Sequence, residues 1–120
     1  MARLGMVTVD CVSARDLAQW WADRLGGSVI DDSDGWFCMV THGEGQPLLG
    51  FQKVDDPTPG KNKMHLDLSA TVEEGGREAA VASFIEAGAV HVSTQGEPGQ
   101  FQWDVLTDPE GNQFCISNPH

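Results

Sequence analysis

An internal repeat of about sixty residues constrains the fold of this chain more than any other feature. The segments "RDLAQWWADRLGG" and "REAAVASFIEAGA" align so that Arg15 falls on Arg77 and Gly26 falls on Gly88. An alternating stretch precedes each segment, "VTVD" in the first half and "LDLS" in the second, with the period of a half-buried strand. A chain that repeats in this way is expected to fold as two similar modules related by pseudo-symmetry.

Each half has the pattern of one strand, one helix and three further strands. In the first half, a helix is expected between Ser13 and Gly27, and strands are expected over residues 6–11, 28–30, 36–41 and 47–54. In the second half, a helix is expected to begin near Arg77, and strands are expected over residues 63–70, 90–94, 100–107 and 113–117. The segment "DDPTPGKN" has the composition of a linker. We therefore predict a single α+β domain over residues 1–120, with a first module over about 1–54, a linker at 55–62 and a second module over about 63–120.

Composition narrows the classes of partner and compartment. The formal net charge is −11, and a field of that sign repels phosphate backbones, so nucleic acid is not expected as a partner. No apolar run is long enough to span a membrane, and "MARLGMVTVD" lacks the apolar stretch of a signal peptide, which predicts a cytoplasmic protein with no membrane partner. The three cysteines include no CxxC pair, which argues against a zinc ribbon.

Three segments, in the order in which they occur, resemble the vicinal oxygen chelate superfamily. Their residues are most similar to those of its glyoxalase-like domain proteins. The segments are "DLAQWWADRLGG", "MHLDL" and "DPEGNQFCI". The superfamily holds glyoxalase I, extradiol dioxygenases, fosfomycin-resistance thiol transferases and bleomycin-resistance proteins. The resemblance implies two tandem βαβββ modules that form cupped mixed sheets. Because each module would leave one apolar sheet face open, we also expect a homodimer.

The resemblance also implies where metal-binding members of the superfamily place their ligands, usually His or Glu, one on each of four strands. The corresponding positions of this chain are Met6, Gln52, His65 and Cys115. Hard divalent ions prefer carboxylate and imidazole donors, whereas these positions offer one imidazole, a thioether, an amide and a thiol. We therefore predict no bound metal and no other cofactor.

His65 and Asp67 are the best candidates for a polar site within the cup. In "KMHLDL", they alternate with Met64, Leu66 and Leu68, so the two sets should point to opposite faces of the strand. Two interpretations are open for the pair, a ligand-binding or proton-transferring dyad and a polar pair buried by hydrogen bonds to neighbouring strands. Cys115 should share their face, either as a thiolate partner of His65 or as an inert buried thiol.

Trp36 and Trp103 lie outside the expected helices, and either could form a flat apolar wall for a planar ligand or pack in a core. Bleomycin-resistance proteins sequester drugs in grooves shared by two subunits. We therefore predict a metal-independent small-molecule binding protein, with a ligand set of His65, Asp67, Gln52, Cys115, Met6, Trp36 and Trp103. The alternative is an enzyme of the lyase or isomerase kind that uses His65 as a base or as a ligand of a divergent metal site. A dimer with a vestigial cup is a third interpretation.

Overall fold

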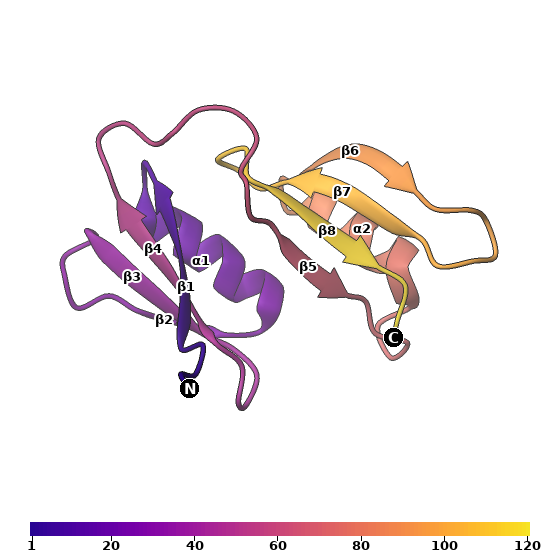
Figure 1. Cartoon of the computed structure of the whole chain (residues 1–120), viewed down its shortest axis with the longest axis horizontal. Helices are drawn as coiled ribbons and strands as arrows, with labels where there is room; N and C mark the ends of the chain where they lie inside the picture. The colour runs from indigo at the N-terminus through magenta and orange to yellow at the C-terminus, as the bar shows by residue number, and fades with distance from the viewer. The chain divides into compact units, whose positions relative to one another are not determined.

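A computed structural model describes all residues, 1–120, and forms two compact units, Met1–Thr58 and Pro59–His120. Each unit is a four-stranded mixed sheet with one helix against it (Figure 1). This confirms the predicted α+β class with two tandem βαβββ modules. The boundary between the units falls inside the segment 55–62. Neither helix has the length and apolar character needed to cross a membrane.

The first unit consists of β1 (Met6–Cys11), α1 (Ala14–Leu25), β2 (Ser28–Ile30), β3 (Phe37–Thr41) and β4 (Leu48–Lys53). The strand order is β1-β4-β3-β2, with β1 parallel to β4 and the remaining pairs antiparallel. Helix α1 follows Ser13, whose hydroxyl donates a hydrogen bond to the Asp16 carboxylate at 3.1 Å. The helix ends at Gly26, whose φ of 66° lies in the left-handed region that glycine adopts most readily.

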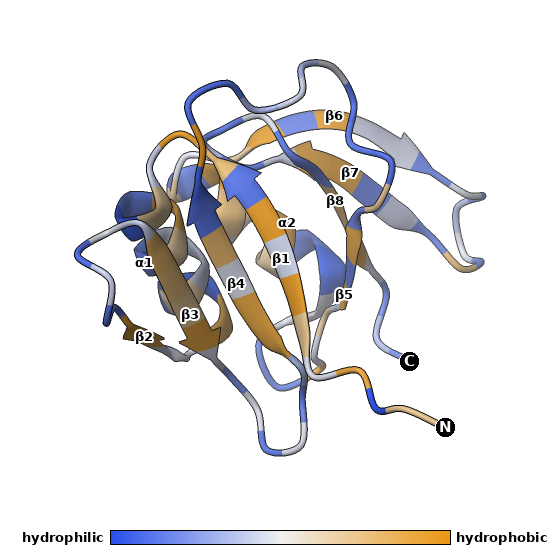
Figure 2. Cartoon of the chain, turned by 60° about the vertical axis from the view of Figure 1, so that its left-hand side comes forward, coloured by the Kyte–Doolittle hydropathy of each residue, from blue (hydrophilic) through white to orange (hydrophobic).

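The core of the first unit lies between α1 and the sheet. Trp21 from the helix is buried, whereas the adjacent Trp20 is only half-buried and packs edge-on against it, with ring centroids 5.1 Å apart. On the sheet, Val40 and Phe51 are buried against the helix. Figure 2 shows hydrophobic colours along much of β1, β3 and β4. Adjacent residues of a helix point in different directions, so only one of the two tryptophans faces the core.

The second unit consists of β5 (Leu66–Ser69), α2 (Gly76–Glu86), β6 (Val90–Gln95), β7 (Trp103–Thr107) and β8 (Gln113–Ser117). The strand order is β5-β8-β7-β6, with β5 parallel to β8. Two strands begin later than expected, because β7 begins at Trp103 and not at residue 100, and β5 begins at Leu66 and not at residue 63. His65 therefore precedes the strand, and Met64 is 77% exposed and does not join the core.

A buried polar network joins α2 to the sheet of the second unit. The Arg77 guanidinium donates hydrogen bonds to the Asp104 carboxylate and, at 2.8 Å, to the side-chain oxygen of Asn118. Asp104 also contacts His91 Nε2 at 2.8 Å and accepts a hydrogen bond from the Thr94 hydroxyl. Burial disfavours the charged form of Asp104, but these hydrogen bonds and the Arg77 charge outweigh it and hold the pKa below its usual range.

The lowered pKa of Asp104 predicts how stability depends on this network. Asp104→Asn leaves the Arg77 charge buried without its counter-ion, so we expect the free energy of unfolding to fall by about 3 kcal/mol at neutral pH. Because the native pKa lies below the unfolded value, the carboxylate stabilises the fold above pH about 4, and this contribution is lost as the pH falls through the native pKa. Urea denaturation followed by circular dichroism, at a series of pH values, measures both effects.

The matched control is Asp34→Asn, since the Asp34 side chain is 99% exposed and pairs with Arg15 only at 3.4 Å. It should change stability little. Equal stability of the Asp104 and Asp34 variants at neutral pH would contradict the role given to the buried network.

Candidate functional site

A groove of about 690 Å³ opens on the second unit, on the face of the sheet opposite α2. Its walls come from all four strands of the second unit and the segments that flank them. Aromatic and aliphatic side chains form one part of the lining, and polar side chains form the other. The lining includes Lys61, His65, Asp67, Phe101, Trp103 and Cys115.

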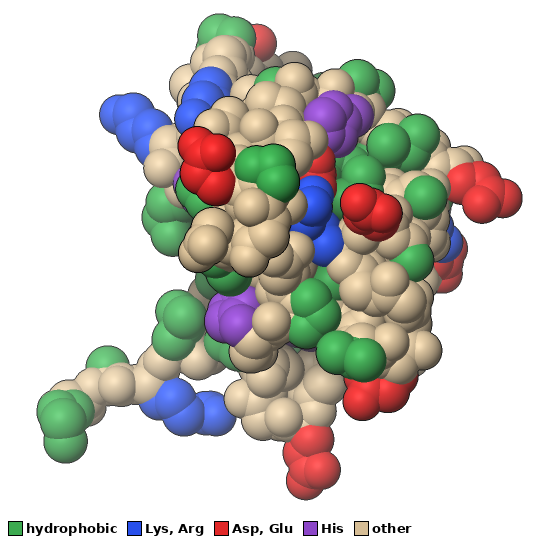
Figure 3. All heavy atoms as spheres, turned by 90° about the vertical axis from the view of Figure 1, so that its right-hand side faces the viewer, with side chains coloured by type: hydrophobic (Ala, Val, Ile, Leu, Met, Phe, Trp, Pro, Cys, Tyr) green, Lys and Arg blue, Asp and Glu red, His purple; other side chains and the backbone are tan.

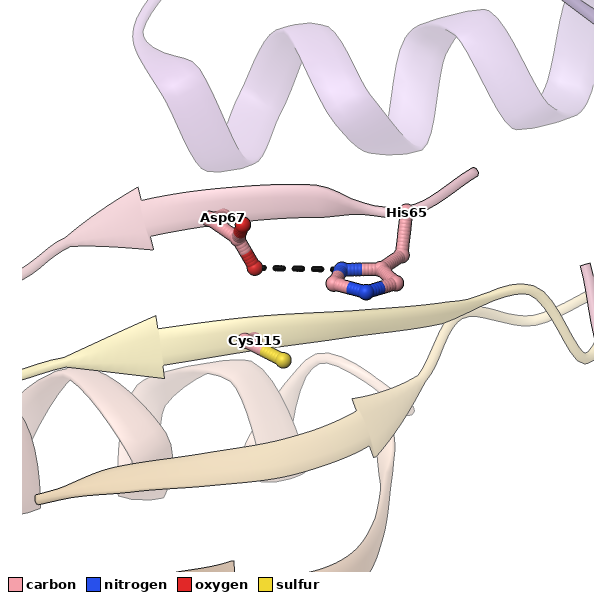
Figure 4. Close-up of side chains that lie close together, drawn as sticks. All are labelled: His65, Asp67 and Cys115. Atoms are coloured by element: carbon pink, nitrogen blue, oxygen red, sulfur yellow. Dashed lines mark hydrogen bonds and ion pairs between the residues drawn. The ribbon is translucent and has the colours of Figure 1, made fainter. Parts of the chain in front are cut away.

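The parallel pairing of β5 with β8 builds the polar part of the groove. The register places Asp67 opposite Cys115, and Cys115 in turn pairs with Val105 on β7, so their side chains share the groove face. His65 lies two residues before Asp67, and its Nδ1 is 3.1 Å from the Asp67 carboxylate (Figure 4). The side chains of His65 and Asp67 are 40% and 71% exposed. This exposure contradicts the interpretation of a pair buried between strands.

Asn62 fixes the chain just before His65. Its side-chain oxygen accepts a hydrogen bond from the Gln113 N–H at 2.8 Å, and its side-chain nitrogen donates to the Gln113 carbonyl at 3.1 Å and to the Met64 carbonyl. The amide thus takes the place of a backbone pairing partner at the start of β8. This contact holds His65 beside the sheet although it lies outside the regular strand.

Trp103 forms the apolar wall. It lies on β7 opposite Ser117, with the same parity as Val105, and its ring lies 6.0 Å from that of Phe101. Phe101 in turn contacts the His120 ring edge-on at 5.5 Å. Trp36, the other predicted wall residue, is not among the residues that line this groove. It lies before β3 in the first unit, where the Lys53 ammonium lies 4.7 Å from the centre of its ring.

The structure places Met6 and Gln52 at different levels of the first sheet. Met6 pairs with Leu48, whereas Gln52 pairs with Asp10, four positions further along β1. In the repeat, "VTVD" falls on "LDLS", so Thr8 corresponds to Asp67, and the residue opposite Thr8, in the place of Cys115, is Gly50. The strand register therefore makes Gly50, and not Gln52, the counterpart of Cys115.

Gly50 also explains why the first sheet has no comparable polar groove face. A Cβ atom added at Gly50 would lie 2.8 Å from the Thr8 hydroxyl, 3.0 Å from the Met6 sulfur and 3.0 Å from the Phe37 ring. The Met6 and Phe37 side chains thus close over the glycine. The two modules share a topology, but only the second one presents His, Asp and Cys side chains on its open face.

The Cys115 thiol is held in its protonated form. Burial raises its pKa, and a hydrogen bond to Asp67 and the charge of that carboxylate raise it further. None of the three cysteines forms a disulfide. The interpretation of Cys115 as an activated thiolate paired with His65 therefore gains no support from the electrostatics, because a nucleophilic cysteine needs a lowered pKa.

One cluster in the structure could hold a metal ion. Ligand atoms of His65, Asp67 and Cys115 all lie within 4.8 Å of one another. The sequence did not identify Asp67 as a metal ligand, because the superfamily resemblance implies only one ligand position on each of the four strands. The hard-ion set that the resemblance implies does not fit, since Met6 offers only a thioether and Gly50 offers no side chain at all.

Charge around the site is mixed. Lys61 lines the groove together with Asp67, so the polar part carries both signs. On the face drawn in Figure 3, acidic side chains are scattered among hydrophobic and uncharged ones and form no single patch. Asp67 is the acidic group within the groove.

Comparisons with known proteins agree with this architecture. The family model described as "Glyoxalase-like domain" matches residues 6–117. A glyoxalase/bleomycin resistance protein/dioxygenase family enzyme from Burkholderia phytofirmans PsJN superposes with a TM-score of 0.78 at 21% identity, over 97% of this chain and 98% of that chain. The fosfomycin resistance protein FosX from Listeria monocytogenes, in complex with Mn(II) and sulfate, gives a TM-score of 0.77 at 10% identity, over 100% of this chain and 92% of that chain. No curated protein matches the chain.

The raised pKa of Cys115 predicts slow alkylation at neutral pH. Because the Asp67 charge contributes to the shift, Asp67→Asn should lower the thiol pKa and increase the rate of modification by iodoacetamide several-fold. Mass spectrometry of the digested protein, with a metal chelator present, resolves Cys115 from the buried Cys11 and Cys38.

Asp56→Asn, in the segment between the units, is the control and should leave the rate unchanged. A slower reaction in the Asp67 variant than in the wild type would show that the carboxylate activates the thiol, contrary to this account.

Proposed function

Because the chain belongs to the glyoxalase-like domain family, we propose that it is a small-molecule binding protein whose ligand lies in the groove of the second module. The ligand class that fits is a planar aromatic compound with a positive charge. The observation that carries the proposal is the pairing of an aromatic wall, Phe101 and Trp103, with an exposed carboxylate, Asp67, in one groove. A drug-sequestering role is one form that such binding could take.

The wall supports the aromatic half of this proposal. The Phe101 and Trp103 rings, 6.0 Å apart and tilted by 37°, present a broad apolar surface. Ligand pockets are commonly built from such surfaces with a few polar groups that fix orientation, and a volume of about 690 Å³ lies in the range of small-molecule sites. A flat ring system buries the most area against this wall.

Asp67 supports the cationic half. Its carboxylate is only partly engaged by His65 and is 71% exposed, so a ligand cation could reach it without an internal ion pair being broken. This contact supplies orientation and a charge-assisted hydrogen bond. Binding of this kind uses side chains alone and requires none of the hard divalent ions that metal-binding members of the superfamily hold.

A second function, an enzyme of the lyase or isomerase kind, is favoured by one observation. The His65–Asp67 contact at 3.1 Å resembles the arrangement in which a carboxylate orients an imidazole that acts as a general base. His65 would then move a proton of a bound substrate through its Nε2 atom. Chemical change of a bound compound, seen by mass spectrometry and abolished by His65→Gln, would support this function over binding alone.

Assembly is a further part of the proposal. Met6 and Ile30 of the first sheet, and Val90 and Val92 of β6, are exposed apolar side chains. We propose that a second copy of the chain covers such surface in a homodimer.

Tryptophan fluorescence tests the binding proposal directly. Ethidium and acridine orange, titrated into the protein with a chelator present, should quench the emission saturably. Trp103→Phe should reduce the quenching because it removes the fluorophore of the wall. Asp67→Asn should weaken the affinity about tenfold, as expected for the loss of one charge-assisted hydrogen bond.

Trp36→Phe is the matched control, since this tryptophan lies in the first unit and should leave the fractional change on binding intact. Binding that survives both the Trp103 and the Asp67 changes would refute the proposed groove and favour the vestigial-cup interpretation.

The dimer predicts a mass of about twice 12.9 kDa in static light scattering at tens of micromolar protein. Val90→Glu, on the exposed surface of β6 and outside the groove lining, should lower the mass toward that of one chain if that strand takes part. A mass of one chain for the wild type would rule out the homodimer.

A further inference from the structure

The donor set of the groove keeps two of the four superfamily positions, His65 and Cys115, and adds Asp67, which is not one of them. The superfamily uses carboxylate and imidazole groups on four strands of two modules, and this chain lacks suitable donors at Met6 and Gly50. The cluster of His65, Asp67 and Cys115, in contrast, comes from one short stretch and one facing strand of the second module. The mismatch excludes a good site for a hard ion and leaves the question of which ion these three groups would select.

We infer that His65, Asp67 and Cys115 form a three-donor site for a thiophilic divalent ion, with Zn²⁺ as the type case, contained within the second module. Thiolate, imidazole and carboxylate together are a donor set that zinc accepts, whereas Mg²⁺ and Mn²⁺ prefer oxygen ligands. The inference does not rest on the proposed binding of an aromatic cation, because it uses neither the Phe101 and Trp103 wall nor a ligand.

The geometry needs little adjustment to close on an ion. Zinc bonds of about 2.0 to 2.3 Å place tetrahedral donors about 3.3 to 3.6 Å apart. The ligand atoms of the three side chains lie within 4.8 Å of one another, and rotation of these side chains is enough to bring the atoms to the separation that zinc requires. Asp67 and Cys115 are held opposite each other by strand register, which fixes two of the three donors.

The third donor, His65, is held by Asn62 through the backbone at Met64 and by the contact of Nδ1 with Asp67. The Nδ1 atom and the Asp67 oxygen are 3.1 Å apart, close to the separation of two tetrahedral zinc ligands, so an ion would take the place of the proton between them.

Binding is a simple exchange at the thiol. The Cys115 S–H bond breaks, its proton leaves to solvent, and a bond forms between Sγ and the ion. Asp67 and the thiolate together offset the two positive charges. Three protein donors leave one tetrahedral position open toward the groove, which water would fill.

Cobalt(II) provides a direct spectroscopic test. The protein, stripped with a chelator and then dialysed, should bind one equivalent of Co²⁺ with the near-ultraviolet charge-transfer band of a thiolate ligand. Zn²⁺ should displace Co²⁺, whereas Mn²⁺ and Mg²⁺ in large excess should not. Cys115→Ser should abolish the band although Cys11 and Cys38 remain, and His65→Gln and Asp67→Asn should each weaken binding at least tenfold.

The controls are His42→Gln and Asp56→Asn, which lie outside the cluster and should bind Co²⁺ as the wild type does. Binding without a thiolate band, binding unchanged by Cys115→Ser, or equal displacement by Mn²⁺ would each overturn the inference. Circular dichroism of each variant establishes that a loss of binding is not a loss of fold. Failure of the dye titration leaves this result untouched, because that titration is carried out with a chelator present.

Discussion

The parallel pairing of the first and last strands of each module is the constraint on which the remaining structure depends. Parallel neighbours cannot be joined by a tight turn, so the chain must cross over through a helix and two further strands before it returns. This requirement places α1 and α2 on one face of their sheets and leaves the opposite face open. In the second module, the same pairing brings Asp67 of β5 opposite Cys115 of β8, although 47 intervening residues separate them.

The two modules show how one backbone plan can lead to different surfaces. Thr8 and Gly50 occupy in the first sheet the places that Asp67 and Cys115 occupy in the second. Glycine lets Met6 and Phe37 close over this part of the strand. Aspartate and cysteine at the same places, with His65 in the place of Met6, give the polar groove face. Changes of residue type, without a change of topology, therefore distinguish the chemistry of the two modules.

Much of the fold could be predicted from the sequence, and the reason is local. The alternation of each strand and the glycine at Gly26 act within a few residues, and the repeat shows the same signals twice, so the helices and strands fell close to their expected ranges. The site depended on non-local register. The sequence assigned the fourth-strand ligand position to Gln52, whereas the pairing of β4 with β1 assigns it to Gly50. No local pattern distinguishes these two residues.

For the same reason, the sequence could not show whether Trp36 or Trp103 forms the wall, since only strand pairing shows which residues share the groove. Trp103 is fixed by partners on both sides of β7, whereas Trp36 precedes its strand.

The groove also combines a rigid side with an adjustable side. Trp103 lies on β7, which is paired on both edges by β6 and β8, so the wall cannot move without disrupting the sheet. Asp67 lies on the outer strand β5, which has four residues and one neighbour, and His65 directly precedes this strand, with Asn62 as added support. Short edge strands open more readily than central ones. A ligand or an ion would thus meet a fixed apolar surface and polar groups that can adapt, an arrangement in which stacking sets position and the three polar side chains adjust to the charge presented to them.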